Sequence, residues 1–316
     1  ICNIMSTKKI AVIGAGNWGK NLVRNFYDLR VLTAVAEVSP ALRETLSYDF
    51  PDITLYTDYR ELLDGTEDAV AIATPAPSHF NIAKSFLEAG KDVFVEKPMT
   101  LSRKDSEELI RIAEEKNRIL MVGHLLLYQP AIRFIKNYLS DGNLGAIYHL
   151  HQERKKLGRA RYVENVTWSL GVHDLAVLIH LVGDSPRHVF ASGHCGLQEK
   201  VEDDVYVHLT FAGGVKAHLH NSWLWPENRR RLTIILEQGM LVYDEIEGTV
   251  SLHRKTIDKD LKSRDEGCEL LFQGGEPPLK LELQHFLDCL ETRQAPISDG
   301  KNGLAVVEAL ERILMI

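Results

Sequence analysis

The sequence predicts an α/β protein in which a doubly wound parallel sheet precedes an α+β domain with a large, open-faced, mostly antiparallel sheet. Over residues 1–122, short apolar strands alternate with amphipathic helices, and no hairpin signal separates the strands. After residue 123 the apolar residues recur with period two, and hairpin-like turns occur at 213–214 and 238–239. We therefore expect two domains, residues 1–122 and residues 123–316.

The composition is that of an ordinary globular chain. Of its 316 residues, 45% are hydrophobic and 26% are charged, and the formal net charge is −7. A negative charge without a basic stripe argues against a nucleic-acid partner, and no apolar run reaches the roughly 18 residues of a membrane helix. The four cysteines lie apart, without metal-binding spacing, and the first residues do not resemble a signal peptide. We therefore expect free thiols and a cytoplasmic protein.

The first predicted strand, 10–13, runs directly into the turn GAGNWG, and a helical pattern follows over 20–27. Strand, glycine-rich turn and helix in this order form the dinucleotide-binding fingerprint, in which the turn approaches a pyrophosphate. The alternative is a glycine-rich turn that binds no nucleotide. The predicted pyrophosphate site consists of Gly14, Gly16, Asn17, Trp18 and Gly19.

A second predicted strand, 31–36, ends in Glu37, which lies 18 residues after Gly19. A carboxylate at this place binds the ribose hydroxyls of NAD and repels the 2′-phosphate of NADP. No arginine follows Glu37 directly, and the nearest is Arg43. The sequence therefore favours NAD over NADP.

Two further strands end in polar residues and prolines. The strand over 69–73 runs into TPAPSH, and the strand that begins at Val93 runs into Glu96-Lys97-Pro98. Because proline cannot continue a central strand and carboxyl ends of strands face the ligand crevice, we expect Lys97 at its mouth. There its ammonium could hold a substrate hydroxyl; the alternative is a surface lysine after an edge strand. The predicted nicotinamide side of the site consists of Thr74, Pro75, Ser78, His79, Glu96 and Lys97, with His79 favoured in a supporting rather than a catalytic role.

The remaining elements follow from the same patterns. In the first domain we expect helices over 58–63, 81–89 and 103–116, the last capped by Ser102, and a strand over 119–122. In the second domain we expect helices over 130–139, 279–290 and 304–314, strands over 147–153, 204–211, 215–221, 231–237 and 240–243, and an exposed loop over 255–275.

The histidines of the second domain resemble metal ligands only superficially. His149 and His151, and likewise His218 and His220, are two residues apart, but no third ligand has suitable spacing, so we expect sheet-face histidines and no metal. A sheet with one uncovered face usually buries it against another subunit. We therefore expect a homodimer or a homotetramer.

A second catalytic stretch, WSLGVHD, opens a helix at 168–174. His173 would lie in the first turn, where the helix dipole keeps an imidazole neutral, and a neutral imidazole is a suitable general base for alcohol oxidation. Asp174 could orient this histidine or cap the helix. The alternative is a histidine at a helix start with no catalytic role.

With the fingerprint, the VFVEKP strand and the WSLGVHD helix in this order, the whole chain resembles the glucose–fructose oxidoreductase/inositol dehydrogenase/MocA family. The resemblance implies a Rossmann domain followed by a domain whose open sheet serves oligomerisation. It also implies that Lys97 and His173 serve the substrate hydroxyl. Many members carry an aspartate four residues before that histidine, where this chain has Ser169. The resemblance therefore leaves Lys97 and His173 to share the proton transfer.

Within the family, GHLLLYQPA at 123–131 and the basic run from Arg154 to Arg161 are similar to the branch that acts on nucleotide-linked sugars. That branch includes UDP-N-acetylglucosaminuronate 3-dehydrogenases, which oxidise the C3 hydroxyl with NAD. The basic residues would suit a carboxylate or diphosphate; a solvated basic loop is the alternative. The implied substrate-binding residues are His124, Tyr128, Arg154, Arg159, Ser169 and Asp174.

The resulting hypothesis is an NAD-dependent oxidoreductase that oxidises a hydroxyl of a sugar or sugar nucleotide. Two alternatives remain on the same scaffold. One keeps the chemistry but changes the substrate or cycle: a free polyol or cyclitol dehydrogenase, or an enzyme that reduces and re-oxidises one tightly held NAD. The other is a non-catalytic NAD-binding regulator.

Overall fold

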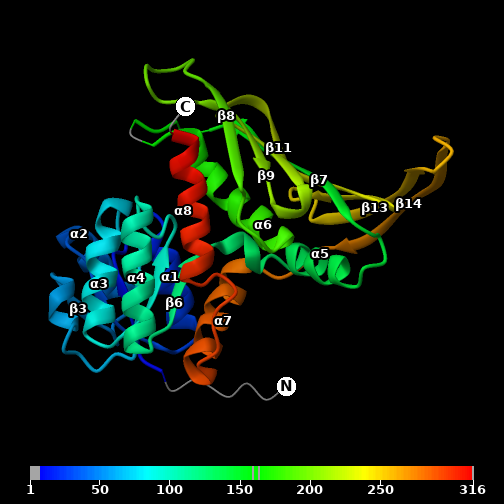
Figure 1. Cartoon of the computed structure of the whole chain (residues 1–316). Helices are drawn as coiled ribbons and strands as arrows, with labels where there is room; N and C mark the ends of the chain where they lie inside the picture. The colour runs from blue at the N-terminus through cyan, green and yellow to red at the C-terminus, as the bar shows by residue number, and fades with distance from the viewer. Residues whose placement is uncertain (1–7, 159, 163, 315–316) are drawn as a thin grey trace. The chain divides into compact units, whose positions relative to one another are not determined.

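The computed structural model describes residues 8–158, 160–162 and 164–314 (Figure 1). Contacts divide this chain into two compact units. The first contains the residues up to His124 together with Leu279–Val307, and the second contains Leu125–Pro278 and the residues from Glu308 onward. The segment 279–307, which the sequence pattern assigned to the second domain, thus packs in the unit that begins the chain.

The first unit is built on a six-stranded sheet with the order β3-β2-β1-β4-β5-β6, in which every pair is parallel. The order reverses between β1 and β4, which is the topological switch point where ligands bind in such sheets. The predicted doubly wound parallel sheet is confirmed. The strands are β1 (Ile10–Ile13), β2 (Leu32–Ala36), β3 (Thr54–Tyr56), β4 (Ala69–Ile72), β5 (Asp92–Glu96) and β6 (Leu120–Gly123).

Helices follow the strands of this unit in alternation. As predicted, the Ser102 side chain caps α4, accepting a hydrogen bond from the Asp105 amide. The predicted helix over 58–63 is a single 3₁₀ turn, Tyr59–Leu62. The strands β1, β4 and β5 are buried along their whole length, because helices cover both faces of the sheet. The helices are α1 (Gly19–Asp28), α2 (Pro40–Asp49), α3 (His79–Glu88), α4 (Arg103–Lys116) and α7 (Pro278–Thr292).

The returning segment is fixed to the sheet by specific contacts. Arg293 donates to both carboxylate oxygens of Asp92, at the start of β5, over 2.6 and 3.0 Å. The Val122 amide in β6 donates to the Ser298 carbonyl over 2.8 Å. The rings of Phe94 and Phe286 pack edge to face at 5.7 Å. The segment therefore belongs to the core of the first unit.

The second unit contains an eight-stranded sheet with the order β14-β13-β12-β11-β7-β10-β9-β8. Of its pairs only β10 with β7 is parallel among the described residues, so the predicted mixed, mostly antiparallel sheet is confirmed. The helices are α5 (Pro130–Ser140), α6 (Val172–Val182) and the last turns of α8 (Gly300–Leu314). The strands are β7 (Ile147–Leu157), β8 (His188–His194), β9 (Asp204–Thr210), β10 (Lys216–Ser222), β11 (Leu224–Leu236), β12 (Gly239–Asp244), β13 (Thr249–Ile257) and β14 (Ser263–Gln273).

The expected loop over 255–275 is wrong. The chain there continues β13 and turns back as β14, and the two strands pair antiparallel. Most of β14 is exposed, so its residues carry no period-two burial that a sequence pattern could reveal. Backbone pairing and cross-strand ion pairs such as Arg254 with Glu269 hold this hairpin instead.

Candidate cofactor and substrate sites

The glycine-rich turn connects β1 to α1 and uses its glycines for different reasons. Gly14 adopts φ +87°, which favours glycine. A Cβ on Gly19 would lie 2.0 Å from the Gly14 carbonyl oxygen, so the helix packs directly on the turn. A Cβ on Gly16 would meet no heavy atom within 4 Å. The backbone at Gly16 is therefore open to a ligand.

Glu37, directly after β2, holds its carboxylate against this turn. Its Oε2 accepts a hydrogen bond of 2.7 Å from the Ala15 amide, and its Oε1 accepts one of 2.9 Å from the Ser39 amide. The Arg43 guanidinium donates to the Glu37 backbone carbonyl over 2.7 Å. The carboxylate is thus fixed beside the turn, where a bound dinucleotide would present a ribose.

Glu96, at the end of β5, is a buried acid. The indole N–H of Trp18 donates to its Oε1, and the Lys97 amide donates to its Oε2 over 3.3 Å. A Cβ on Gly123, the last residue of β6, would lie 2.9 Å from Oε2, so glycine there makes room for the carboxyl group. Burial raises the pKa of Glu96 to about 7. The carboxyl group joins the glycine-rich turn to the backbone of Lys97.

The loop after β4 is ordered by its own polar groups. Ser78 Oγ lies 2.7 Å from both Thr74 Oγ1 and the Pro75 carbonyl oxygen. His79 begins α3 and is 1% exposed. Its two ring nitrogens each lie 2.8 Å from a backbone carbonyl oxygen, and this favours a supporting role over direct contact with a cofactor.

Two further buried polar side chains, His124 and Glu282, lie in the first unit. His124 is 1% exposed, neither ring nitrogen has a hydrogen-bond partner among the described residues, and burial lowers its pKa to about 3. Glu282 in α7 is fully buried, and burial, with a contribution from Glu96, raises its pKa well above the usual value. Sequence reasoning missed Glu282. The available signal was an acid on the apolar face of a helix, between Leu281 and Leu283.

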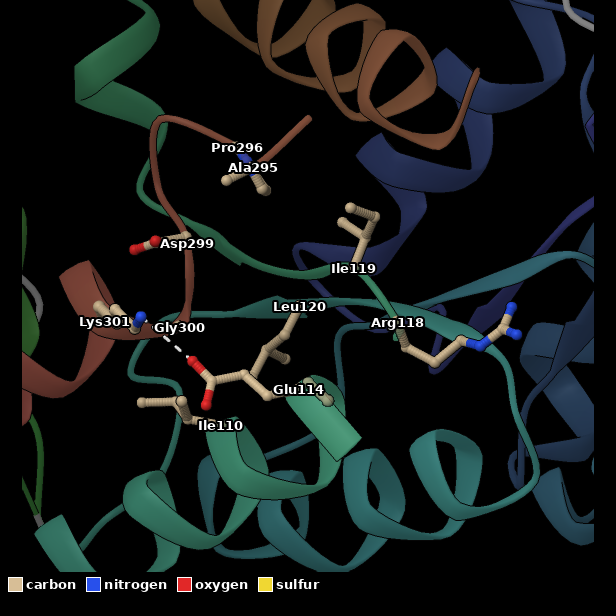
Figure 2. Close-up of a pocket in the computed structure, with 11 residues that line it drawn as sticks. Ile110, Glu114, Arg118, Ile119, Leu120, Ala295, Pro296, Asp299, Gly300 and Lys301 are labelled. Carbon is tan, nitrogen blue, oxygen red and sulfur yellow. Dashed lines mark ion pairs between the residues drawn. The ribbon is translucent and has the colours of Figure 1, made fainter. Parts of the chain in front are cut away.

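A groove of about 180 Å³ in the first unit lies at the amino end of β6 (Figure 2). An ion pair of 3.1 Å joins Glu114 and Lys301 at its rim. Because the glycine-rich turn lies at the carboxyl ends of the strands, this groove is separate from the predicted cofactor site. Its apolar lining is formed by Ile110, Ala113, Ile119, Leu120, Ala295 and Pro296.

His173 is carried by a continuous helical segment of the second unit. A π-helix, Thr167–Gly171, directly precedes α6, and Asn165 Oδ1 accepts hydrogen bonds of 3.1 Å from the amides of Thr167 and Trp168. His173 is the second residue of α6 and lies in its first turn, as expected, but the preceding π-helix places the positive end of the continuous helical segment near Thr167. Insertions of this type occur frequently at functional sites. Ser169 lies within the π-helix.

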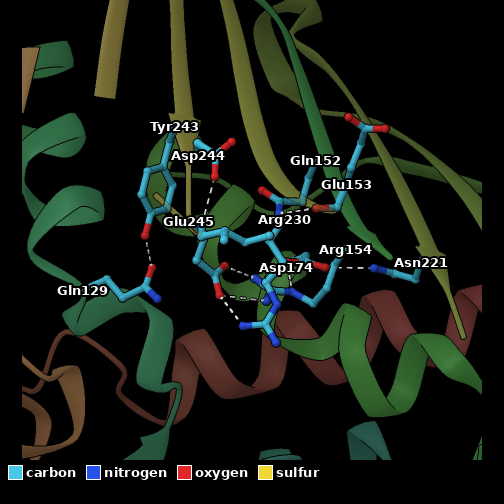
Figure 3. A network of polar contacts seen from close by, with 11 residues as sticks. Gln129, Gln152, Glu153, Arg154, Asp174, Asn221, Arg230, Tyr243, Asp244 and Glu245 are labelled. Atoms are coloured by element: carbon cyan, nitrogen blue, oxygen red, sulfur yellow. Dashed lines mark hydrogen bonds and ion pairs between the residues drawn. The ribbon is translucent and has the colours of Figure 1, made fainter. Parts of the chain in front are cut away.

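Arg154 and Asp174 belong to a buried polar network (Figure 3). Arg154 Nε donates to Asp174 over 2.8 Å, and its two Nη atoms bind both oxygens of Glu245 at 3.1 and 2.6 Å. Asn221 donates to the second oxygen of Asp174 over 2.8 Å, and Arg230 donates to Glu245 over 3.0 Å. These contacts favour a structural role for both residues, and their contact with substrate stays a prediction.

The other predicted substrate residues have varied surroundings. Tyr128 is 1% exposed and ends a 3₁₀ turn, Leu125–Tyr128. In the basic run, Lys155 is buried, pairs with Glu153 at 2.8 Å, and lies 3.9 Å above the Trp225 ring. Arg159 lies outside the described residues.

The histidines of the sheet form a larger group than the sequence indicated. His218 lies between His151 on β7 and His208 on β9 in the strand register, and the His208 and His218 rings are 4.5 Å apart. Over the described ranges, no cluster of three or more His, Cys, Asp or Glu side chains could hold a metal ion. No described helix is long and apolar enough to cross a membrane.

Comparison with protein families identifies the scaffold. Residues 8–124 match the GFO/IDH/MocA oxidoreductase family with an NAD-binding Rossmann fold, and residues 132–242 match the C-terminal domain of the same family. The chain belongs to this family. The resemblance inferred from the sequence is confirmed, and the protein is an oxidoreductase of the GFO/IDH/MocA type.

Relatives within the GFO/IDH/MocA family act on sugars and polyols. UDP-N-acetylglucosamine 3-dehydrogenase of Acidithiobacillus ferrooxidans is 28% identical over 95% of this chain and 94% of the relative. The NADP⁺-dependent scyllo-inositol 2-dehydrogenase of Bacillus subtilis is 28% identical over 77% of this chain and 71% of the relative. A solved structure of the A. ferrooxidans enzyme has a TM-score of 0.86 at 25% identity, covering 97% of this chain and 96% of that chain. An oxidoreductase structure from Magnetospirillum magnetotacticum has a TM-score of 0.83 at 30% identity, covering 97% and 99%.

Proposed function

We propose that this protein is an NAD-dependent dehydrogenase that oxidises the C3 hydroxyl of a nucleotide-linked sugar. The observation that carries the cofactor assignment is the Glu37 carboxylate, fixed by the Ala15 and Ser39 amides beside an open glycine-rich turn. A 2′-phosphate next to this buried charge would be repelled. The substrate assignment is supported by the UDP-N-acetylglucosamine 3-dehydrogenase relative, which matches the chain almost end to end.

The residues of the chain fit the dinucleotide. The turn residues Gly14, Gly16, Asn17, Trp18 and Gly19 would hold its pyrophosphate, and Glu37 its ribose. When bound, the nicotinamide supplies the hydride acceptor. The loops after β4 and β5 would form the nicotinamide side, through Thr74, Pro75, Ser78, His79, Glu96 and Lys97.

Two side chains would handle the proton of the substrate hydroxyl. Lys97 follows β5 and is half-buried, so its ammonium would hold and polarise the hydroxyl oxygen. His173, half-buried after the π-helix, would accept the hydroxyl proton as the hydride leaves carbon. His124, Tyr128, Arg159 and Ser169 remain proposed substrate contacts.

Two UDP-linked sugars, UDP-N-acetylglucosaminuronate and its uncharged parent UDP-N-acetylglucosamine, are the candidate substrates, and experiment must decide between them. A uronate would need a cation for its carboxylate, and because Arg154 and Lys155 are engaged by carboxylates of the protein itself, that role would fall to Arg159 or another residue of the basic run. We place UDP-N-acetylglucosamine before UDP-N-acetylglucosaminuronate because it is the substrate named for the relative that matches the chain almost end to end. A free cyclitol is the second candidate, supported by the scyllo-inositol dehydrogenase relative.

The decisive experiment is a turnover assay with NAD or NADP and a panel of sugars, followed by the absorbance of the reduced cofactor. The panel contains UDP-N-acetylglucosamine, its uronate, free glucose and myo-inositol, with a 2-oxoacid in parallel to reveal a cofactor that stays bound. Turnover with a UDP-linked sugar alone supports the proposal, and turnover with inositol alone supports the second candidate. NAD binding without turnover on any substrate would overturn both and support a regulator.

We also propose that the open face of the eight-stranded sheet pairs with a second copy of the chain. Strands lie about 4.8 Å apart and rise about 3.3 Å per residue, so eight strands of at least six residues present roughly 760 Å² or more. This is about the area that each partner contributes to a stable interface. Light scattering after size-exclusion chromatography should give a dimer or tetramer mass, and a monomer would contradict this.

A further inference from the structure

Glu96 ends β5, and both oxygens of its buried carboxyl group face N–H donors. The indole N–H of Trp18, in the glycine-rich turn, donates to Oε1. The backbone amide of Lys97 donates to Oε2 over 3.3 Å. Two donors suit a carboxylate, which accepts at both oxygens, better than a carboxylic acid, which must use one oxygen as a donor. The contacts thus favour the charged form of this acid, although it is buried.

A second buried acid lies in the same unit but does not share this environment. Glu282 on α7 is 0% exposed, and neither of its carboxyl oxygens has a hydrogen-bond partner among the described residues. Burial, with a smaller contribution from the charge of Glu96, raises the pKa of Glu282 well above its usual value. Of these two acids, Glu96 is therefore the one that carries a negative charge near neutral pH.

The strand order places Glu96 on the nicotinamide side of a bound dinucleotide. Ligands cross such a sheet at the switch point, here between β1 and β4, and Glu37 after β2 would bind the adenine ribose. The other half of the dinucleotide would then extend over the ends of β4 and β5, where Glu96 lies. This placement rests on the proposed function, whereas the contacts of Glu96 do not.

The nicotinamide ring carries a positive charge in NAD⁺ and none in NADH. We propose that Glu96 is a specificity-determining residue whose buried carboxylate favours the positively charged ring of NAD⁺ over the neutral ring of NADH. A charge in a buried site acts more strongly than one in water, because little solvent screens it. Lys97 is half-buried, so solvent screens its ammonium more than it screens this carboxylate. The carboxylate thus raises the affinity for NAD⁺ relative to that for NADH.

The preference should depend on pH, because burial raises the pKa of Glu96 to about 7. The hydrogen bond from Trp18 and the charge and amide of Lys97 lower this pKa, but by less than burial raises it. The histidines of the neighbouring loops, His79 and His124, have lowered pKa values and are therefore neutral at pH 7. Glu96 loses its proton as pH rises from about 6 to about 8, so the ratio of NAD⁺ to NADH affinity should rise about fivefold.

The test measures the NAD⁺ and NADH affinities of the whole protein by calorimetric titration at about pH 6 and about pH 8, without any sugar. In Glu96→Gln, the ratio of NAD⁺ to NADH affinity should fall about tenfold at the higher pH and lose its dependence on pH. The amide can accept only one of the two hydrogen bonds, and this structural effect lowers both affinities without changing their ratio. Glu282→Gln, a buried change that removes no charge, is the matched control and should keep the wild-type ratio at both pH values.

An unchanged ratio in Glu96→Gln, an equal change in Glu282→Gln, or a wild-type ratio that does not depend on pH would overturn the proposal. If both cofactors bind with the expected ratios but no sugar is oxidised, the proposed function fails while the inference about Glu96 stands. A protein that binds neither cofactor would overturn both.

Discussion

Glu37 Oε2 accepts a 2.7 Å hydrogen bond from the amide of Ala15, so the carboxylate after β2 is tied to the turn after β1. The negative charge is held in one place before any cofactor binds. Pre-arranged in this way, it discriminates between a ribose hydroxyl and a ribose phosphate without having to move.

Glu37→Gln should therefore weaken the choice between cofactors. The amide keeps the size of the side chain but removes the charge that repels a 2′-phosphate, so the ratio of NAD to NADP affinity should fall about tenfold or more. Calorimetric titration with both cofactors measures this ratio. Glu44→Gln, an exposed change on α2, should leave the ratio unaltered. An unchanged ratio in Glu37→Gln would contradict the assignment.

Alanine substitutions at Gly16 and Gly19 should affect different properties of the protein. Gly16→Ala adds a methyl group into open space, so the protein should keep its thermal stability but lose cofactor affinity, because the methyl group occupies the pyrophosphate position. Gly19→Ala places a Cβ 2.0 Å from a backbone oxygen, so it should lower the unfolding temperature even without cofactor. Thermal unfolding with and without NAD separates the two effects. Full NAD affinity in Gly16→Ala would argue against the pyrophosphate position.

Lys97→Ala should lower turnover about 10²–10⁴-fold, because a group that polarises the hydroxyl and exchanges protons with it is lost. NAD affinity should stay within about threefold, since the glycine-rich turn and Glu37 are untouched. Steady-state kinetics together with cofactor titration test both statements. Lys104→Ala, an exposed change on α4, is the matched control. Retained activity in Lys97→Ala would remove this lysine from the mechanism.

Glu96 should make stability depend on pH near neutrality. Its pKa is about 7 in the folded protein and about 4.5 when unfolded, so the folded state binds more protons between these values. The free energy of unfolding therefore falls as pH rises from about 4.5 to 7. Glu96→Gln should lose this fall, and urea unfolding at several pH values compares it with the wild type.

Trp18→Phe should shift the pKa of Glu96 in the folded protein instead of removing the carboxyl group. Its indole hydrogen bond lowers the pKa of Glu96, so removing it should move the fall in stability to higher pH. Identical pH dependence in the wild type and in Glu96→Gln would show that this carboxyl group is not the one that titrates.

The Arg154 network should contribute more to stability than surface ion pairs do. Arg154→Met leaves the buried carboxylates of Asp174 and Glu245 without their shared cation, which should cost about 3–5 kcal/mol of unfolding free energy. Arg254→Met removes a solvent-exposed pair with Glu269 and should leave the unfolding free energy nearly unchanged. Urea unfolding gives both values. Equal small losses would argue that the network is not a structural element.

Most of the fold could be predicted from local patterns in the sequence. The parallel sheet, the glycine-rich turn and the strand that leads to Lys97 follow from alternating short elements, whose signals lie within a few residues. The β13–β14 hairpin was not predicted, because most residues of β14 are exposed and apolar residues do not alternate with polar ones along it. The helical segment that carries His173 was predicted to begin within one residue of Thr167, but its π-helical first part was not, because a π-helix has no pattern of its own in the sequence.

The environment of the site residues could not be read from the sequence. Arg154 on β7 contacts Asp174 and Glu245, which lie 20 and 91 positions further along the chain. These residues come together only through the order of the strands and helices in the fold. The same holds for His79, whose partners are carbonyl oxygens of two loops. Every residue has a backbone carbonyl oxygen, so the type of residue does not reveal which carbonyl a side chain will contact.

The return of Leu279–Val307 to the first unit affects how the protein is made. When the ribosome has released residue 124, the dinucleotide-binding sheet still lacks the arginine that binds Asp92 and the phenylalanine that covers Phe94. Both arrive only after Leu125–Pro278, the main part of the second unit, has been translated. The core of the first unit therefore cannot be completed until Leu279–Val307 has been synthesised. A fragment cut after the glycine-rich half would keep the nucleotide motif but not the finished core beneath it.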